Sequence, residues 1–204
     1  RQRDGVNTIE KNQETFEVCY DILKNNGHLI IFPEGNHNSK KTLRSLKKGV
    51  SRIALGTLTK YGKDTPLFIV PIGIDYENHF SMNADVLVNV GNPISIGDYF
   101  DDYDKNPVET VNKLTQKVRQ NLKSVLIHIE DIENYDEIYY LLHRFPLNNE
   151  KKTEQKYRTR KSLLSKLERI KEEEFKTYNQ LLTDVNIVKS FVKENKIILG
   201  INLI

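Results

Sequence analysis

The short loop Phe32-Pro33-Glu34-Gly35 and the basic residues after it are the part of this sequence best suited to chemistry. From Gly35 to Lys63 there are eight lysines and arginines and no aspartate or glutamate, although the whole chain has 31 basic and 28 acidic residues. A local excess of positive charge is typical of a site for an anion such as a phosphate. The charge pattern alone leaves open a solvated basic face without a ligand.

Lys47 and Lys48 stand at the start of a helix that the apolar spacing predicts over residues 46–61. The helix dipole is positive at that end, so two cations there are unfavourable unless an anion binds between them. The loop itself follows a short apolar run, His28–Phe32, which predicts a buried strand. Because ligands of open α/β sheets bind at the carboxyl ends of strands, position and charge together predict an anion site.

A nucleotide-binding loop is the alternative reading of the same residues. Residues 35–42 match the pattern G-x-x-x-x-G-K-[ST] except that Lys40 replaces the second glycine, where a side chain would obstruct the approach of the backbone to phosphate. Asp75, at the end of an apolar run, is the only candidate partner for magnesium. A degenerate nucleotide-binding domain is therefore the less favoured alternative.

The remaining elements predict an α/β domain with a helical C-terminal extension. A helix bearing Phe16, Cys19, Tyr20 and Leu23 on one face precedes the loop, and strands are predicted at Leu67–Ile74 and Val86–Val90. Strand, helix and strand in this order predict a mostly parallel sheet flanked by helices. We expect a first domain over residues 1–130, which ends in a helix that starts at Pro107.

The extension is predicted over residues 131–204. It contains a short helix at Tyr135–Leu142 and a charged helical stretch over 151–182 whose apolar stripe is a docking face. The closing apolar run, Ile197–Ile204, is too short to span a membrane. It would begin a membrane-inserted segment if the parent chain continues apolar, and otherwise it packs on the domain.

Three short blocks make this sequence resemble the glycerolipid acyltransferase family, which includes lysophosphatidate and glycerol-phosphate acyltransferases. They are the stretch from Phe32 to Asn38, then Lys47-Lys48-Gly49, then Val70-Pro71-Ile72-Gly73-Ile74, in the family's order and spacing. The resemblance implies an acceptor site formed by the glutamate turn and by cations on the acceptor phosphate. The substrate-binding residues it implies are Arg1, Glu34, Gly35, Asn36, His37 and Lys47.

The family's catalytic block, His-x-x-x-x-Asp, is absent, because none of the five histidines has an aspartate five positions later. We therefore assign no catalytic residue and expect an O-acyltransferase in the parent protein but an inactive fragment. A phosphate- or lipid-binding domain without catalysis is the alternative. His37 stands where the family usually has arginine, so a permanent charge is replaced by one that titrates near neutrality, and the acceptor head group could differ.

The resemblance also implies the partners. The donor would be acyl-CoA or acyl-carrier protein, with no other cofactor and no metal, and the acceptor would be glycerol phosphate or a lysophospholipid such as 1-acylglycerol-3-phosphate. Phospholipid biosynthesis places this reaction at a membrane surface. A single cysteine, Cys19, fits a reducing compartment, so we expect the cytoplasmic face of the inner membrane, peripheral or anchored. A net charge of only +3 gives no reason to expect nucleic acid.

Overall fold

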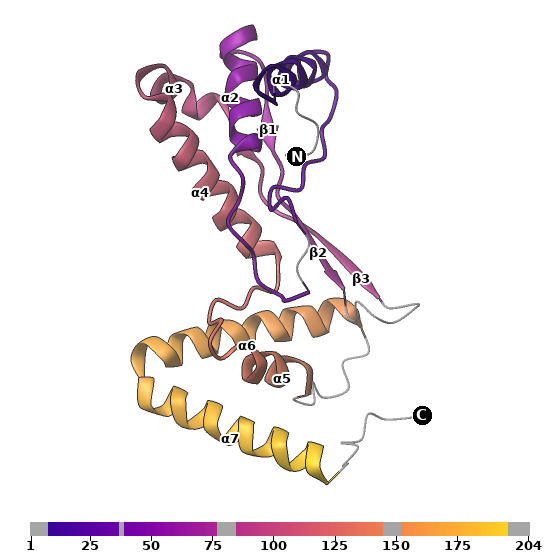
Figure 1. Cartoon of the computed structure of the whole chain (residues 1–204), viewed down its shortest axis with the longest axis vertical. Coiled ribbons are helices and arrows are strands. Elements are labelled where there is room, and N and C mark those ends of the chain that lie inside the picture. Colours follow the sequence, from indigo (N-terminus) through magenta and orange to yellow (C-terminus); the bar gives the residue numbers. More distant parts are fainter. Residues whose placement is uncertain (1–7, 37–38, 77–84, 145–151, 196–204) are drawn as a thin grey trace. The chain divides into compact units, whose positions relative to one another are not determined.

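The computed structural model describes residues 8–36, 39–76, 85–144 and 152–195 (Figure 1). These residues form two compact units. Unit 1 draws on Arg1–Ser39, Leu43–Ile74 and Val88–Leu126, and unit 2 draws on Lys40–Thr42, Asp75–Leu87 and Ile127–Ile204. The chain therefore enters unit 2 twice before its C-terminal part. The predicted division at residue 130 took no account of these two interruptions and stays a prediction.

Unit 1 contains the helices predicted before the loop, over residues 46–61 and from Pro107; the second of these begins three residues later than predicted, at Gly49, and the short helix α3 was not predicted. Its elements are α1 (Thr8–Lys24), α2 (Gly49–Tyr61), β1 (Phe68–Ile69), β4 (Ile94–Ser95), the 3₁₀ turn η1 (Gly97–Tyr99), α3 (Phe100–Lys105) and α4 (Pro107–Val125), with parts of β2 (Ile72–Tyr76) and β3 (Val86–Val90). After α1 and α2 the backbone turns through left-handed conformations, with φ of 58° at Asn26 and 92° at Gly62. Asn106 caps α4 by accepting a 3.3 Å hydrogen bond from the Glu109 amide.

The core of unit 1 forms where α2 packs on α4 and on the strand end at β4. Leu55 and Leu58 of α2, Leu114 of α4 and Ile96 after β4 are all fully buried. Each of these side chains contributes about 1.5–3 kcal/mol by its burial. This packing holds α2 in place within unit 1, and with it the end of the loop that precedes the helix.

The strands form one long antiparallel ribbon that is interrupted at Pro71. β1 pairs antiparallel with β4, and β2 pairs with β3 in a second two-stranded sheet. Between these two sheets Gly91 donates a 2.8 Å hydrogen bond to the Pro71 carbonyl, but Pro71 has no N–H to donate in return. The predicted strand over 67–74 is therefore split in two, and the predicted strand over 86–90 is confirmed.

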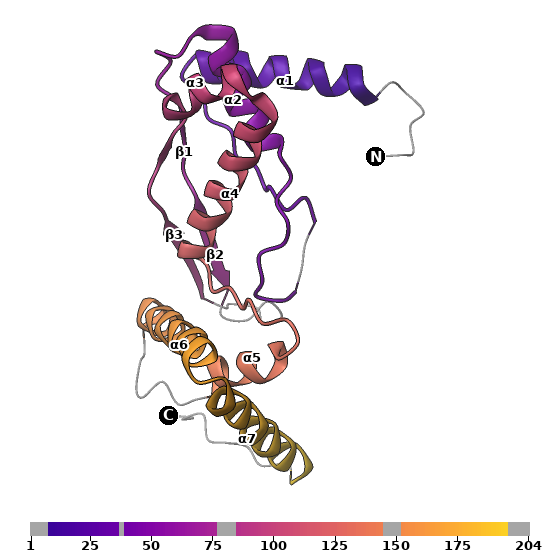
Figure 2. The ribbon, with the colours of Figure 1, turned by 90° about the vertical axis from the view of Figure 1, so that its left-hand side faces the viewer.

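α4 lies along one face of this ribbon, and no helix among the described residues of unit 1 lies along the other (Figure 2). Gly73 faces the end of α4, where the carbonyl of Val125 lies close to it. The residues next to Gly73 in β2 and two residues of β3 carry large apolar side chains that are 39–67% exposed. They are Ile72, Ile74, Val88 and Val90. We call these four residues the open face.

The prediction of a mostly parallel sheet is wrong for the described residues, although the mixed α/β class holds. His28–Phe32, the strand predicted before the loop, has no strand assignment, and Ile30 and Phe32 are 87% and 75% exposed. A β-strand needs a neighbour for its N–H and C=O groups, and no described strand lies alongside this segment. The sheets that form are small and antiparallel.

Unit 2 is built mainly from three helices, α5 (Tyr135–Arg144), α6 (Thr153–Glu173) and α7 (Phe175–Glu194), which lie side by side (Figure 2). Leu142, Leu167 and Tyr178 are buried in their shared core. The predicted stripe on α6 is confirmed as a packing face, with Leu167 buried and Leu163 and Ile170 half-buried. No described helix is long and apolar enough to cross a membrane, and the predicted apolar run at 197–204 lies outside the described residues.

Asp131 connects the segment before α5 to α6 and α7 by hydrogen bonds. Its carboxylate accepts hydrogen bonds from Lys171 at 2.7 Å, from the Tyr178 hydroxyl at 2.9 Å, and from the Asn134 amide at 3.1 Å. Burial alone would raise the pKa of Asp131, but these donors favour the ionised form and hold the pKa well below its usual range. No local pattern predicts these contacts of Asp131, because its partners lie up to 47 positions away.

Replacing Gly73 with alanine tests the close approach of β2 to α4. A Cβ at Gly73 would lie 2.2 Å from the carbonyl oxygen of Val125, so we expect the free energy of unfolding to fall by about 1–3 kcal/mol. Gly49→Ala is the matched control, because a Cβ there meets nothing within 4 Å and alanine favours a helix. Urea unfolding followed by circular dichroism measures both variants, and an unchanged midpoint for Gly73→Ala would contradict the contact.

Candidate functional site

The loop after Phe32 is closed at its base by backbone hydrogen bonds. Gly35 adopts φ of 74°, a left-handed conformation that favours glycine, and its N–H donates to the Phe32 carbonyl at 3.2 Å. The N–H of Lys47 donates to the Pro33 carbonyl at 2.8 Å. We call residues 33–47 the acceptor loop, and its two ends are therefore held side by side.

Glu34 braces the acceptor loop from inside. Its Oε2 accepts a 2.9 Å hydrogen bond from the backbone N–H of Arg44. This contact to the backbone uses one of the two carboxylate oxygens of Glu34.

The first turn of α2 carries positive charge without any acidic partner on the helix. Lys48 is its N-cap residue, no side chain caps the helix, and its first turn contains no acidic residue. The neighbouring Lys47 has its stem near Gly35, whose ideal Cβ would lie 3.8 Å from the Lys47 Cγ. The free N–H groups of this turn and the two lysines favour an anion, as the sequence predicts.

A hollow of about 330 Å³ opens beside this helix end, between α2, α4 and the acceptor loop. Two cations line it and no acidic residue does. Arg119 of α4 also fixes the loop backbone, because it donates to the carbonyls of Leu43 at 3.1 Å and Arg44 at 2.6 Å. The residues around the hollow are Ser45, Leu46, Lys48, Asn112, Thr115, Gln116 and Arg119.

The structure brings four of the six predicted site residues together. Glu34, Gly35 and Asn36 form the turn, and Lys47 closes it. Arg1 and His37 lie outside the described residues. Sequence reasoning missed Lys48 as a lining residue and Arg119 entirely. The basic run around Lys48 was the sequence signal for that residue. Arg119 had no such signal, because it lies 75 positions after Arg44 and only its helix was predicted.

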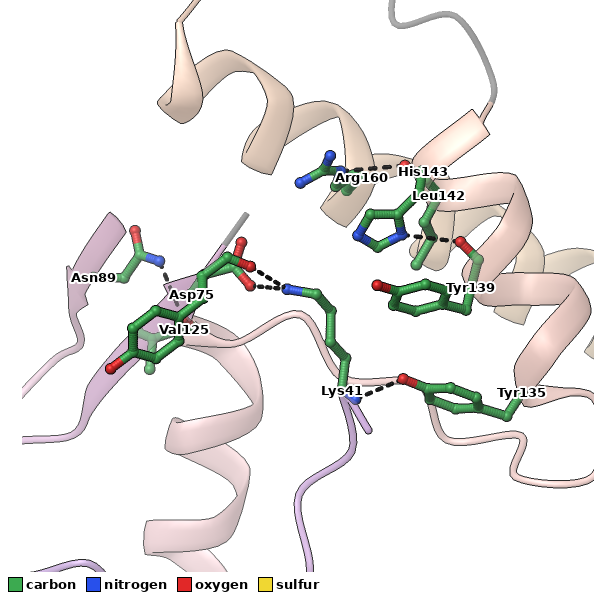
Figure 3. A network of polar contacts seen from close by, with 10 residues as sticks. Lys41, Asp75, Asn89, Val125, Tyr135, Tyr139, Leu142, His143 and Arg160 are labelled. Carbon is green, nitrogen blue, oxygen red and sulfur yellow. Dashed lines mark hydrogen bonds and ion pairs between the residues drawn. The ribbon is translucent and has the colours of Figure 1, made fainter. Parts of the chain in front are cut away.

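The nucleotide-binding alternative loses both of the residues it needs. Lys41, the lysine of that pattern, forms a buried ion pair with Asp75, its only candidate magnesium ligand (Figure 3). The two side chains are 6% and 8% exposed, so neither faces a ligand in solvent. Among residues with described side chains, no three metal-binding groups come together either.

His143 of α5 has the contacts of a structural histidine. Its Nδ1 donates to the Tyr139 carbonyl at 2.9 Å, and its ring stacks on Tyr139 with centroids 4.0 Å apart (Figure 3). Its Nε2 is buried with no hydrogen-bond partner among the described residues. Burial lowers the pKa of His143 to about 4, and the charges of Arg160 and Lys41 act in the same direction.

The pKa of His143 predicts a loss of stability in acid. Its folded pKa lies below the ordinary value of 6.5, so the unfolded chain takes up a proton first and stability falls as the pH drops from about 6.5 to 4. His143→Phe keeps the stacked ring and cannot titrate. We expect its loss of unfolding free energy between pH 7 and pH 4.5 to be about 1–2 kcal/mol smaller than that of the unaltered chain.

Urea unfolding at the two pH values measures this difference. Carboxylates such as Asp131 titrate in both proteins, so their contribution cancels in the comparison. An equal acid sensitivity of the two proteins would show that His143 is protonated in the folded state.

Comparison with known sequences identifies proteins that are similar to this chain. Residues 3–75 match the sequence profile described as acyltransferase. The chain is 33% identical over 126 residues to glycerol-3-phosphate O-acyltransferase 2 of Saccharomyces cerevisiae, a match that covers 61% of this chain and 16% of that protein. It is 31% identical over 121 residues to glycerol-3-phosphate O-acyltransferase 1 of the same yeast, covering 58% of this chain and 16% of the relative.

A third relative is an uncharacterized acyltransferase of Schizosaccharomyces pombe, 28% identical over 107 residues, with 52% of this chain and 16% of the relative covered. The match therefore spans about 16% of the length of each of these relatives. No solved structure matches the chain significantly.

Proposed function

We propose that this chain is part of a glycerolipid acyltransferase, since residues 3–75 match an acyltransferase profile, and that the whole protein transfers an acyl group to a phosphate-bearing glycerol acceptor. The acceptor loop and the first turn of α2 would form part of the acceptor site. The observation that carries the proposal is the pair Lys47 and Lys48 at a helix start without a side-chain cap or an acidic residue. A phosphate bound there would pair with both lysines and accept hydrogen bonds from the free N–H groups of the first helical turn.

The hollow beside α2 supports the same assignment. Its two cations, Lys48 and Arg119, have no acidic residue among their lining neighbours, so an anion entering it meets only attractive charge. Glu34 accepts one backbone N–H and is only half-buried, so it has capacity left for an acceptor hydroxyl. A site that combines these cations with a hydroxyl acceptor would suit a glycerol phosphate, which carries a phosphate and free hydroxyl groups.

The reaction itself needs a base. An acceptor hydroxyl attacks the thioester carbonyl, so that a C–O bond forms and the C–S bond breaks, and the hydroxyl proton passes through the base to the leaving thiolate. In the family this base is the histidine of the His-x-x-x-x-Asp block, which these 204 residues do not contain. The residues of this chain would bind and orient the acceptor for that attack.

Glycerol 3-phosphate is the acceptor we propose first, because two relatives are named for it. A lysophospholipid such as 1-acylglycerol-3-phosphate carries the same phosphate and is the second candidate. The donor would be acyl-CoA or acyl-carrier protein, with no further cofactor.

We also propose that the protein works on the cytoplasmic face of a membrane, where the products of such a reaction collect. The apolar side chains Ile187, Val188 and Phe191 of α7 are 49–63% exposed and give unit 2 a surface that suits lipid contact. Lys193 in the last turn of the same helix suits an anionic surface.

The lysines test the acceptor site in the whole protein. We expect Lys47→Met and Lys48→Met each to raise the KM for glycerol 3-phosphate by about 10- to 100-fold, because each removes a charged contact to phosphate. The KM for acyl-CoA should stay unchanged. Thiol release from acyl-CoA, followed with a colorimetric thiol reagent, measures both constants.

Lys63→Met is the matched control, since Lys63 is an exposed lysine of the same basic run but follows α2 rather than precedes it. Its kinetic constants should match those of the unaltered protein. Unchanged acceptor KM values in both loop variants would place the phosphate elsewhere. A whole protein that binds glycerol 3-phosphate but releases no thiol would favour a binding domain without catalysis.

His37 tests acceptor choice. If a titrating side chain at this position has redirected the site, His37→Arg should raise kcat/KM for phosphate acceptors relative to a lysophospholipid with a neutral head group, by about tenfold. The comparison uses matched acyl chains at pH 7.5, where an unperturbed histidine is mostly neutral. An unchanged ratio of the two kcat/KM values would remove His37 from acceptor recognition.

A further inference from the structure

We propose that Arg119 of α4 binds the acceptor phosphate directly, in the hollow that it lines together with Lys48. This inference rests on the proposed function and adds to it a phosphate-binding residue. Arg119 lies outside residues 3–75, which match the acyltransferase profile, so the resemblance to the family does not supply it. Arg119, α2 and the loop segment that begins at Leu43 all belong to unit 1.

One nitrogen of the Arg119 guanidinium is fixed by the acceptor loop. Nη1 donates to the backbone carbonyl of Leu43 at 3.1 Å and to that of Arg44 at 2.6 Å. The Leu43 side chain is buried in the core of unit 1, so the loop is a firm anchor at this point. The guanidinium is therefore oriented before a ligand binds, and little of its conformational freedom remains to be lost on binding.

The other side of the guanidinium has donors to spare. A guanidinium carries more N–H donors than the two loop carbonyls use, and Nε and Nη2 of Arg119 form no hydrogen bond among the described residues. The Nε–H and one Nη2–H lie parallel, which matches two oxygens of a phosphate. Because Arg119 is half-buried and lines the hollow, a phosphate in the hollow can meet these donors.

The remaining residues around the hollow suit a polar head group rather than an acyl chain. Leu46 is the only apolar side chain among the described residues that line it. Lys48 adds a second positive charge, and no acidic residue lines the hollow. A volume of about 330 Å³ is at the small end of the usual range for ligand pockets, about 300–1,000 Å³. The hollow therefore fits the phosphate end of an acceptor, and an acyl chain would lie outside it.

The alternative is that Arg119 only anchors the loop. An anchor would act through the loop, where the Arg44 N–H donates to Glu34, the residue proposed to accept the glycerol hydroxyls. Its loss would weaken binding of glycerol 3-phosphate but not of inorganic phosphate, which has no glycerol hydroxyls. A direct contact to phosphate predicts that both ligands are weakened by the same factor.

The experiment measures the dissociation constants of glycerol 3-phosphate and inorganic phosphate for the whole protein by titration calorimetry. Arg119→Gln removes the charge but keeps an amide that can donate to the loop carbonyls. Arg119→Lys restores the charge without the parallel donors. Lys117→Gln is the matched control, because Lys117 is an exposed cation of α4 that does not line the hollow. Thiol release from acyl-CoA gives the KM values of the same variants.

We expect Arg119→Gln to raise both dissociation constants, and the KM for glycerol 3-phosphate, by about 10- to 100-fold, as loss of a charged hydrogen bond to phosphate should. The KM for acyl-CoA should stay unchanged. Arg119→Lys should recover part of the lost affinity for both ligands. Lys117→Gln should match the unaltered protein in every quantity.

Three results would overturn the inference: an unchanged dissociation constant for inorganic phosphate in Arg119→Gln, an equal rise of the acyl-CoA KM, or an equal loss of affinity in Lys117→Gln. Circular dichroism checks that each variant folds. Should Arg119→Gln fail to fold, Arg119→Lys decides by the same comparison, with a loss of about three- to tenfold for both ligands expected.

Failure of the proposed function would look different. If the unaltered whole protein releases no thiol from acyl-CoA, the proposed acyl transfer fails, but the two dissociation constants still decide the role of Arg119. Equal weakening of both ligands in Arg119→Gln supports the phosphate contact. If the unaltered protein binds neither ligand, the contact is overturned as well.

Discussion

The buried ion pair between Lys41 and Asp75 is the constraint that joins two of the three chain segments from which unit 2 is built. Two charges taken out of water gain little net stability, since their attraction is largely offset by the loss of hydration. Removal of one partner alone is costly, at about 3–5 kcal/mol, because the other stays buried and unpaired. The pair therefore acts mainly by fixing which chain segments meet, namely the segment of Lys41 and the end of β2.

The acceptor loop combines two kinds of restraint with different physical origins. At its base, backbone hydrogen bonds to Pro33 and from Arg44 close the turn, and the packing of α2 against α4 holds the helix end that follows. Lys41, which belongs to unit 2, is held by its pair with Asp75. A phosphate site of two lysines needs such restraint, because long side chains lose much conformational entropy when they bind. Rigid surroundings reduce the part of that loss that falls on the backbone.

Local sequence patterns predicted the helices well, and they failed wherever a structure depends on distant partners. Apolar spacing and stop residues such as Gly62 located α1, α2 and α4, since helices satisfy their own hydrogen bonds within one segment. The strand at His28–Phe32 was wrong for the described residues because no spacing rule reveals whether a neighbour is present. The family motif identified Glu34 and Lys47 as candidate substrate-binding residues. Arg119 and the Lys41–Asp75 pair have no local signal, so only the fold reveals them.

The open face on Ile72, Ile74, Val88 and Val90 has a practical consequence for handling this polypeptide. Its exposed apolar side chains can associate with a second chain, and each strand of the two-stranded sheets has an edge that pairs with no other described strand, which a further strand can extend. Natural sheets guard such edges with charged side chains or proline, and here Pro71 interrupts the ribbon only at one point. Dilute storage and a solubilising fusion partner should therefore keep the chain from aggregating, and light scattering should rise with protein concentration when both are omitted.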